Sequence, residues 1–205
     1  MAKNLDLATL FQSVTSNLLQ NKDTLNEADT YNHDHGDNMV QIFEVITQAM
    51  QAKQGADPAD QLAYASQLLR KKSQSGTAQF YVEGLSKAAQ EFTGQKITPD
   101  NAIQLVHNLL GAEPQQQSGG NLLGSLLSGL TGGGQAAQDD SLDAGDLLNA
   151  GLAFMQSKQQ GESTSEALMD ALVAGTAMGQ TPYRAQSGAL VANTLMQVIG
   201  SMGQK

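Results

Sequence analysis

Apolar residues recur at helical spacing along much of this 205-residue chain, and no segment shows the sustained alternation expected of a β-strand. The clearest apolar stripes are formed by Leu7, Leu10, Phe11, Val14 and Leu18, and by Met39, Phe43, Ile46 and Met50. This pattern predicts an all-α fold of about eight helices with essentially no sheet. The two halves of the chain do not differ in character, so residues 1–205 are expected to form a single helical domain.

Several predicted helices have recognisable start signals. Asp57 precedes Pro58, which combines an N-cap residue with a proline at the first helical position. Signals of this kind predict helices that begin at Pro58, near Gly76, at Pro99, after Ser163 and near Ser187. The helix from Gly76 is expected to end at Gly94, because glycine is favoured just beyond a helix C-terminus.

Composition excludes several classes of function. The formal net charge is -9, with 20 acidic against 11 basic residues, which argues against a nucleic-acid-binding protein. The absence of cysteine excludes disulfides and thiol chemistry. The sequence has no apolar run of ~20 residues and no signal-peptide pattern at its start, so we expect a cytoplasmic protein without a membrane span.

Residues 113–140 differ from the rest of the chain. This segment is rich in Gly, Gln and Ser but contains five leucines that would stripe one short helix. It could be a linker whose helix docks on the core, or a lid over a ligand site. A helix on a membrane surface is the least favoured interpretation, because its polar face has no Lys or Arg.

The stretch YNHDHGDNM, residues 31–39, carries most of the candidate chemistry. Oxygen ligands suited to Mg2+ are supplied here and just upstream by Glu27, Asp29, Asn32, Asp34 and Asp37. The acids do not have the offsets of an EF-hand, and a zinc site is poorly supported because only His107 lies outside the stretch. The simpler alternative is that Asp34 or Asp37 caps a helix that starts at Asn38.

Three stretches in this order carry a resemblance to a known family. They are Asp34-His35-Gly36-Asp37-Asn38-Met39, then Ser73-Gln74-Ser75-Gly76, and then Gly179, Tyr183 and Ser187-Gly188-Ala189. They resemble, respectively, the Gly-Asp-Gly-Asp-His-Gly-x-Asn-Met motif, the Gly-Ala-Ser-Gly turn, and the Gly-Arg-Ala-Ser-Tyr and Asp-Pro-Gly-Ala stretches of one family. That family is the nucleotide-binding C-terminal domain, or L subunit, of the dihydroxyacetone (glycerone) kinases.

The resemblance implies a barrel of antiparallel helices with a nucleotide site in the loops at one end. It implies Mg2+ and ADP or ATP as cofactors, with metal ligands at Glu27, Asn32 and Asp34. The implied nucleotide-binding residues are His35, Gly36, Asp37, Asn38, Gln74, Ser75, Gly76, Gln180, Ser187 and Gly188. Ser75-Gly76 and Ser187-Gly188 would act as exposed backbone donors at helix starts. No catalytic side chain is implied, since phosphoryl transfer depends mainly on positioning and charge neutralisation.

The chain also departs from the family pattern. Of the three metal acids, only Asp34 is kept as aspartate, and Gln180 replaces the family's arginine. Two hypotheses follow from the resemblance. The chain is a kinase (phosphotransferase) subunit that acts with a separate acceptor-binding partner protein, with a homodimer left open, or it is a catalytically impaired relative that serves as a binding or regulatory scaffold.

Overall fold

The computed structural model of the chain describes residues 4–111, 173 and 176–203. In these residues it contains seven α-helices and one 3-10 helix, with no strand, so the predicted all-α class is confirmed for this part of the chain. The predictions for residues 113–140 and for a helix after Ser163 lie outside the described residues. Within the described part, no helix combines the length and the apolarity needed to cross a membrane.

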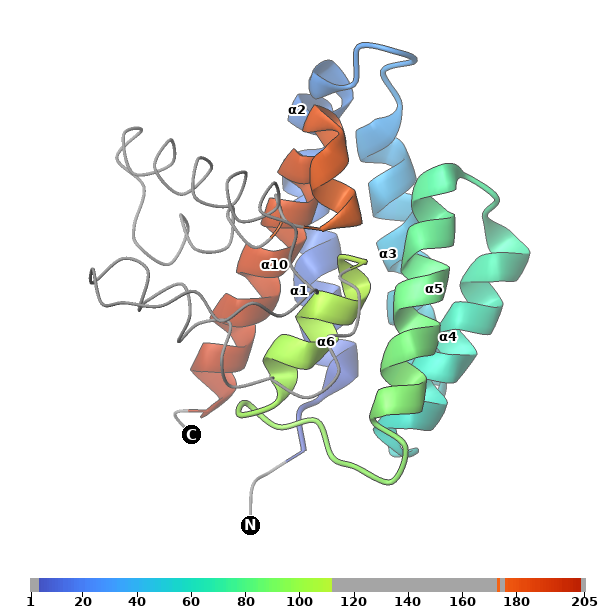
Figure 1. The fold of residues 1–205 in the computed structure, drawn as a ribbon, viewed down its shortest axis with the longest axis vertical. Coiled ribbons are helices and arrows are strands. Elements are labelled where there is room, and N and C mark those ends of the chain that lie inside the picture. The colour runs from blue at the N-terminus through green and yellow to red at the C-terminus, as the bar shows by residue number, and fades with distance from the viewer. Residues whose placement is uncertain (1–3, 112–172, 174–175, 204–205) are drawn as a thin grey trace, which may run out of the picture.

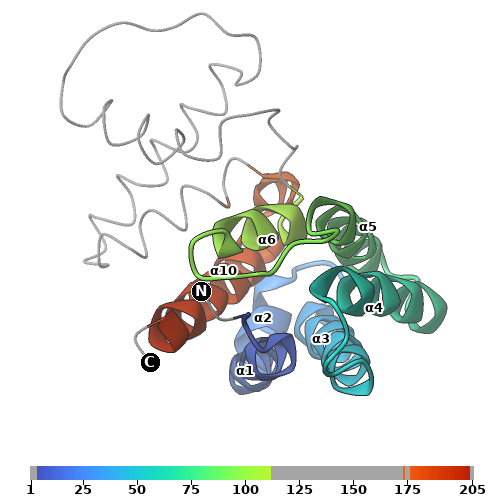
Figure 2. The same ribbon diagram turned by 90° about the horizontal axis from the view of Figure 1, so that it is seen from below.

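The helices pack as a closed circuit around a common core. They are α1 (Leu7–Gln20), α2 (Lys22–Ala28), α3 (His35–Ala52), α4 (Pro58–Lys72), α5 (Gly76–Glu91), α6 (Ala102–Leu109), η1 (Ala177–Gln180) and α10 (Pro182–Gly203). Contacts run from α1 to α3, α4, α5, α6 and α10 in turn, and α10 closes the circuit by packing on α1. Figure 1 shows these helices from the side, and Figure 2 shows the circuit along its axis. The short helix α2 packs on the start of α3.

Three aromatic side chains connect the helices inside this circuit. The rings of Phe11 and Phe43 lie 6.2 Å apart between α1 and α3. Phe43 in turn meets the ring of Tyr81 from α5 edge-on, at 4.9 Å. All three side chains are buried, and the described apolar residues around them form one cluster. The apolar stripes of the sequence therefore meet in one core, as helical periodicity requires.

Local side-chain contacts explain where the best-predicted helices begin. Asp6 accepts a hydrogen bond from the Ala8 backbone N–H at 3.1 Å and so caps α1. The Ser75 hydroxyl accepts from the Ala78 backbone N–H at 3.1 Å and caps α5, which begins at Gly76 as predicted. Helix α4 begins at Pro58, also as predicted. Helix α5 ends at Glu91, and Gly94 follows with a φ of +71°, the left-handed conformation that glycine tolerates.

Other predicted starts were wrong. Helix α6 begins at Ala102 rather than Pro99, because the Asn101 side chain accepts the Thr98 backbone N–H and holds a turn ahead of the helix. Helix α10 begins at Pro182 rather than near Ser187, with proline in the first turn where its missing N–H costs nothing.

The start of α3 also differs from the prediction, since it begins at His35 and not at Asn38. Asp34 occupies the N-cap position, yet its side chain makes no capping hydrogen bond. Helix α2, which ends six residues before Asp34, was not predicted at all.

Candidate functional site

The three stretches that carry the resemblance lie at one end of the helical circuit. The loop between α2 and α3, the connection between α4 and α5 and the first turn of α10 all lie at the upper end in Figure 1. Because neighbouring helices of the circuit run antiparallel, these connections lie at the same end, although up to about 150 residues separate them along the chain. Side chains from each of them meet there.

His35, in the first turn of α3, is joined to α10 by a buried hydrogen bond. Its Nε2 lies 2.9 Å from the Ser187 hydroxyl oxygen, and the two residues are 3% and 0% exposed. The Tyr183 ring meets the imidazole edge-on at 4.8 Å. A buried polar pair of this kind is costly unless it is satisfied, so the contact fixes α10 against α3.

The same contact defines the state of the imidazole. The Ser187 hydroxyl donates its only proton to the Arg184 backbone carbonyl at 3.0 Å, so the proton between Ser187 and His35 belongs to Nε2. Burial lowers the pKa of His35 below its ordinary value of 6.5, the negative charges of Asp29 and Asp34 oppose this shift, and Arg184 adds to it. A neutral ring with a protonated Nε2 follows at pH 7.

Arg184 is a residue at this end of the circuit that the sequence analysis did not select. Its guanidinium carbon lies 5.1 Å from the Phe80 ring centre and 5.6 Å from the Tyr183 ring centre. Its Nη2 lies against Gly76, since a Cβ built on that glycine would be 3.4 Å away. Within the described residues, its Nε is buried and has no hydrogen-bond partner, and no acid there forms a salt bridge with it.

This arrangement is suited to an anion. A buried, unpartnered N–H of a charged group costs free energy, and an oxyanion would recover it with a charge-assisted hydrogen bond. The positive end of α5 adds to the attraction. The available signal in the sequence was that Arg184 is the only charged residue in α10. Because Arg184 follows Tyr183 rather than preceding it, the motif comparison did not select it.

Asn26 of α2 organises the other side of this end. Its Oδ1 accepts hydrogen bonds from the backbone N–H groups of Gly36 at 2.7 Å and Asp37 at 3.2 Å. Its Nδ2 donates to Asp37 at 2.9 Å, and Lys22 forms a salt bridge with the same carboxylate at 3.1 Å. These hydrogen bonds, first Asn26 and then Lys22, lower the pKa of Asp37. The backbone N–H groups of Gly36 and Asp37, two of the residues implied to bind nucleotide, are thus engaged by Asn26.

The residues predicted to bind metal are spread over the same loop. Glu27, Asn32 and Asp34 are all exposed, and Asp34 Oδ1 accepts a hydrogen bond from the Asn38 side chain at 2.7 Å. Within the described ranges, no three His, Cys, Asp or Glu side chains come together as a metal site. Mg2+ commonly takes one or two carboxylates and completes its shell with phosphate and water, and Glu27 and Asp34 are the two carboxylates of the predicted set.

The remaining predicted nucleotide-binding residues divide into two groups. Gln74 is exposed between α4 and α5, next to the capping residue Ser75, and Gln180 ends η1. The prediction of exposed donors at Ser187 and Gly188 was wrong. Both residues are buried inside α10, and a Cβ on Gly188 would lie 3.2 Å from the Val173 side chain. The reason is the earlier start of α10, which places both residues in its second turn rather than at its N-terminus.

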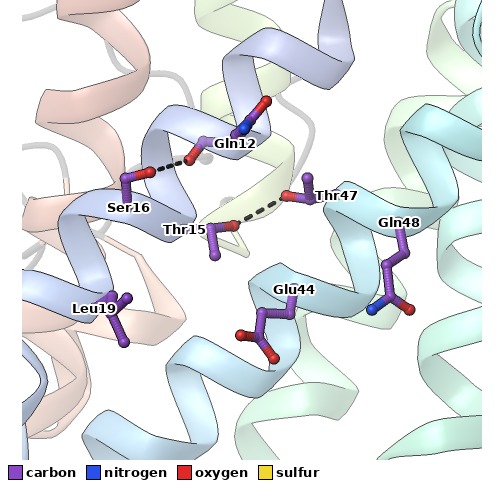
Figure 3. Close-up of a pocket in the computed structure, with 7 residues that line it drawn as sticks. All are labelled: Gln12, Thr15, Ser16, Leu19, Glu44, Thr47 and Gln48. Atoms are coloured by element: carbon purple, nitrogen blue, oxygen red, sulfur yellow. Dashed lines mark hydrogen bonds between the residues drawn. The ribbon is translucent and has the colours of Figure 1, made fainter.

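A separate groove of about 350 Å³ lies between α1 and α3 (Figure 3). Its lining residues are Gln12, Thr15, Ser16, Leu19, Glu44, Thr47 and Gln48. The Thr15 and Thr47 hydroxyls are hydrogen-bonded across it at 2.9 Å, and Ser16 bonds the Gln12 carbonyl of its own helix. The groove involves none of the residues that meet around His35 and Arg184.

Comparisons with protein-family models, with curated proteins and with solved structures gave no match to this chain.

Proposed function

We propose that the chain is a nucleotide-binding phosphotransferase subunit that holds the phosphates of ADP or ATP at the end of the helical circuit. The observation that carries this proposal is Arg184, whose buried Nε has no partner among the described residues and whose guanidinium lies at the first residue of α5. Stacking on Phe80 and Tyr183 fixes the guanidinium plane, so little ordering entropy is lost when an oxyanion binds.

The residues at this end of the helical circuit would have separate roles in binding the nucleotide. Arg184 binds phosphate oxygens, while neutral His35 and Ser187 hold α10 so that Arg184 keeps its position. Asp34 and Glu27, with the Asn32 amide, would hold Mg2+, which when bound neutralises phosphate charge. Phosphoryl transfer is promoted mainly by such positioning and neutralisation. The proposal extends to an eight-helix barrel and to a partner protein that supplies the phosphoryl acceptor.

A second candidate function is a scaffold of the same fold without catalysis. The observation in its favour is that Asn26 engages the backbone N–H groups of Gly36 and Asp37, while Lys22 engages the Asp37 carboxylate. These groups are satisfied without a ligand. The scaffold would act through protein partners.

Calorimetric titration with ADP and ATP, with and without Mg2+, distinguishes the two candidates. The native chain should bind with micromolar, Mg2+-dependent affinity. Arg184→Gln should weaken binding about 10-fold or more, as expected when a charged hydrogen bond worth ~1.5–3 kcal/mol is lost. Lys96→Gln is the matched control, because it removes one exposed positive charge at the α5–α6 connection, at the other end of α5. No heat at millimolar nucleotide would refute the first function and leave the scaffold.

Asn32→Asp tests the metal side separately. Asn32 is exposed, so restoring a carboxylate there should leave the fold intact. A gain in nucleotide affinity that appears only with Mg2+ is expected, because the added charge lies in the predicted ligand set. An unchanged affinity would remove Asn32 from that set.

A further inference from the structure

Tyr31 is the most exposed large apolar side chain that the structure identifies. It is 92% exposed, whereas Leu19, the other exposed large apolar side chain of the described residues, is 59% exposed. Tyr31 lies in the α2–α3 loop, at the same end as Arg184. Among the described residues, the aromatic and cation–π contacts involve other rings, so the Tyr31 ring is available to a ligand.

The loop holds this residue on a defined turn. Asp29 is only 4% exposed, and its Oδ1 accepts a hydrogen bond from the Tyr31 backbone N–H at 3.0 Å. His33 adopts a φ of +58°, an unfavourable conformation for a residue with a side chain, and its ring lies 3.3 Å from the Asn26 carbonyl oxygen. The backbone is therefore fixed on both sides of an exposed ring.

The surroundings of the ring favour a small planar ligand over a protein surface. A protein interface needs a contiguous patch buried by many residues. The neighbours Thr30, Asn32, His33 and Asp34 are exposed and polar, so Tyr31 is an isolated ring on a polar loop. One aromatic face is sufficient for stacking a nucleobase, which presents a π surface of similar size.

The base of the loop lies close to the proposed phosphate subsite. His35, four residues after Tyr31, lies 2.9 Å from the Ser187 hydroxyl and meets the ring of Tyr183, the residue before Arg184. The ring of Tyr31 thus extends from a turn anchored beside the groups that would bind phosphate. A nucleotide needs this arrangement, with its base and its phosphates held by neighbouring but separate groups.

We propose that Tyr31 is a stacking platform for the base of the nucleotide whose phosphates Arg184 binds. This inference rests on the proposed function and adds the group that distinguishes a nucleotide from a bare phosphate chain. Stacking uses the face of the base and not its hydrogen-bonding edge, so the platform accepts nucleoside diphosphates and triphosphates with little choice among bases.

The test compares ADP with pyrophosphate, which has the phosphates without the base. Both ligands are titrated calorimetrically, with Mg2+, into the native chain and into Tyr31→Ala, Tyr31→Phe and Arg184→Gln. Tyr31→Ala should weaken ADP about 10-fold and leave pyrophosphate within about 2-fold, since stacking on one ring contributes ~1–3 kcal/mol per base. Tyr31→Phe should keep the native affinity, and Arg184→Gln should weaken both ligands. Leu19→Ala is the matched control, because it truncates the other exposed apolar side chain.

Fluorescence gives a second measurement of the same contact. The chain has four tyrosines and no tryptophan, so its intrinsic emission comes from tyrosine alone. ADP should quench part of this emission and pyrophosphate should not. The ADP-specific quenching should disappear in Tyr31→Phe, although that variant still binds ADP.

Each of the other possible results would contradict a specific part of the proposal. If pyrophosphate and ADP bind but Tyr31→Ala leaves ADP unchanged, the platform is wrong and the proposed function stands. Equal weakening of both ligands by Tyr31→Ala would mean that the residue only shapes the loop, which also overturns the platform. If neither ligand binds the native chain, the proposed function and the platform fail together.

Discussion

Helix α3 carries polar side chains in two regions that differ in how those groups are satisfied. Its first turn buries His35 against Ser187 at 3% and 0% exposure and packs against α2 through Gly36. Its middle lines the open groove with α1, where Thr47 bonds Thr15 and the side chains of Glu44 and Gln48 are exposed. Both regions bury a polar group that bonds another helix, but His35 bonds a residue 152 positions away, whereas Thr47 bonds one 32 positions away and borders an open groove.

This difference shows that a hollow lined by polar groups is weak evidence for a site. Around the groove, the hydroxyls of Thr15 and Ser16 bond their own helix backbone, so they are satisfied in the absence of any ligand. Near the first turn of α3, Arg184 has a buried N–H that no described residue accepts. An unpartnered charged donor would gain a hydrogen bond from a bound anion, whereas polar groups that already pair with one another would not.

Of the variants that test this difference, Gly36→Ala is expected to have the largest effect on stability. An added Cβ would overlap the Lys22 backbone carbonyl and come within 2.9 Å of the Asn26 side chain, so α2 would have to move. The free energy of unfolding should fall by about 3 kcal/mol or more, at the upper end of overpacking effects. Gly200→Ala is the control, because open space surrounds that glycine, and there a gain of ~0.5–1 kcal/mol is expected. Urea unfolding measures both, and an equal effect of the two variants would show that α2 does not press on α3.

Ser187→Ala and Thr47→Val give a sharper comparison of the two polar regions. Ser187→Ala leaves the buried Nε2 of His35 without its partner and should cost ~1–3 kcal/mol of unfolding free energy. Thr47→Val keeps the shape and removes a bond to Thr15, which still bonds the Phe11 carbonyl, so a smaller cost of ~0.5–1 kcal/mol is expected. Thermal and urea unfolding of the two variants side by side would measure the difference. A larger loss at Thr47 would reverse the comparison.

The smallest expected effect is a dependence of stability on pH. Burial lowers the pKa of both His35 and His107 below the ordinary value of 6.5. As the pH falls through 6.5, the unfolded chain takes up protons at these histidines that the folded chain does not. The contribution of the two histidines to stability is therefore complete above pH 6.5 and is lost progressively below it. Urea midpoints at pH 7.5 and 5.5 should therefore differ, with the lower value at pH 5.5. The double variant His35→Gln, His107→Gln should show a smaller difference between the two urea midpoints. An unchanged difference would mean that other groups cause the dependence of stability on pH.

The sequence by itself determined most of the helical frame. Periodicity placed the faces of α1 and α3, and the signals at Pro58 and Gly76 gave the starts of α4 and α5. These features depend on residues three to four positions apart, which interact whatever the rest of the chain does. Helix α2 escaped prediction because its seven residues bury only Leu25 and so carry no apolar stripe.

The tertiary structure alone decided the content of the site. It placed His35 on Ser187, Arg184 on Phe80, and Asn26 on the first turn of α3, and none of these contacts has a local signal. Starting α10 at Pro182 buried Ser187 and turned Arg184 toward α5, which removed two predicted donors and supplied an unpredicted one. The physical reason is that burial and unpaired donors depend on which helices meet, and packing of the core sets that at separations of 100 residues or more.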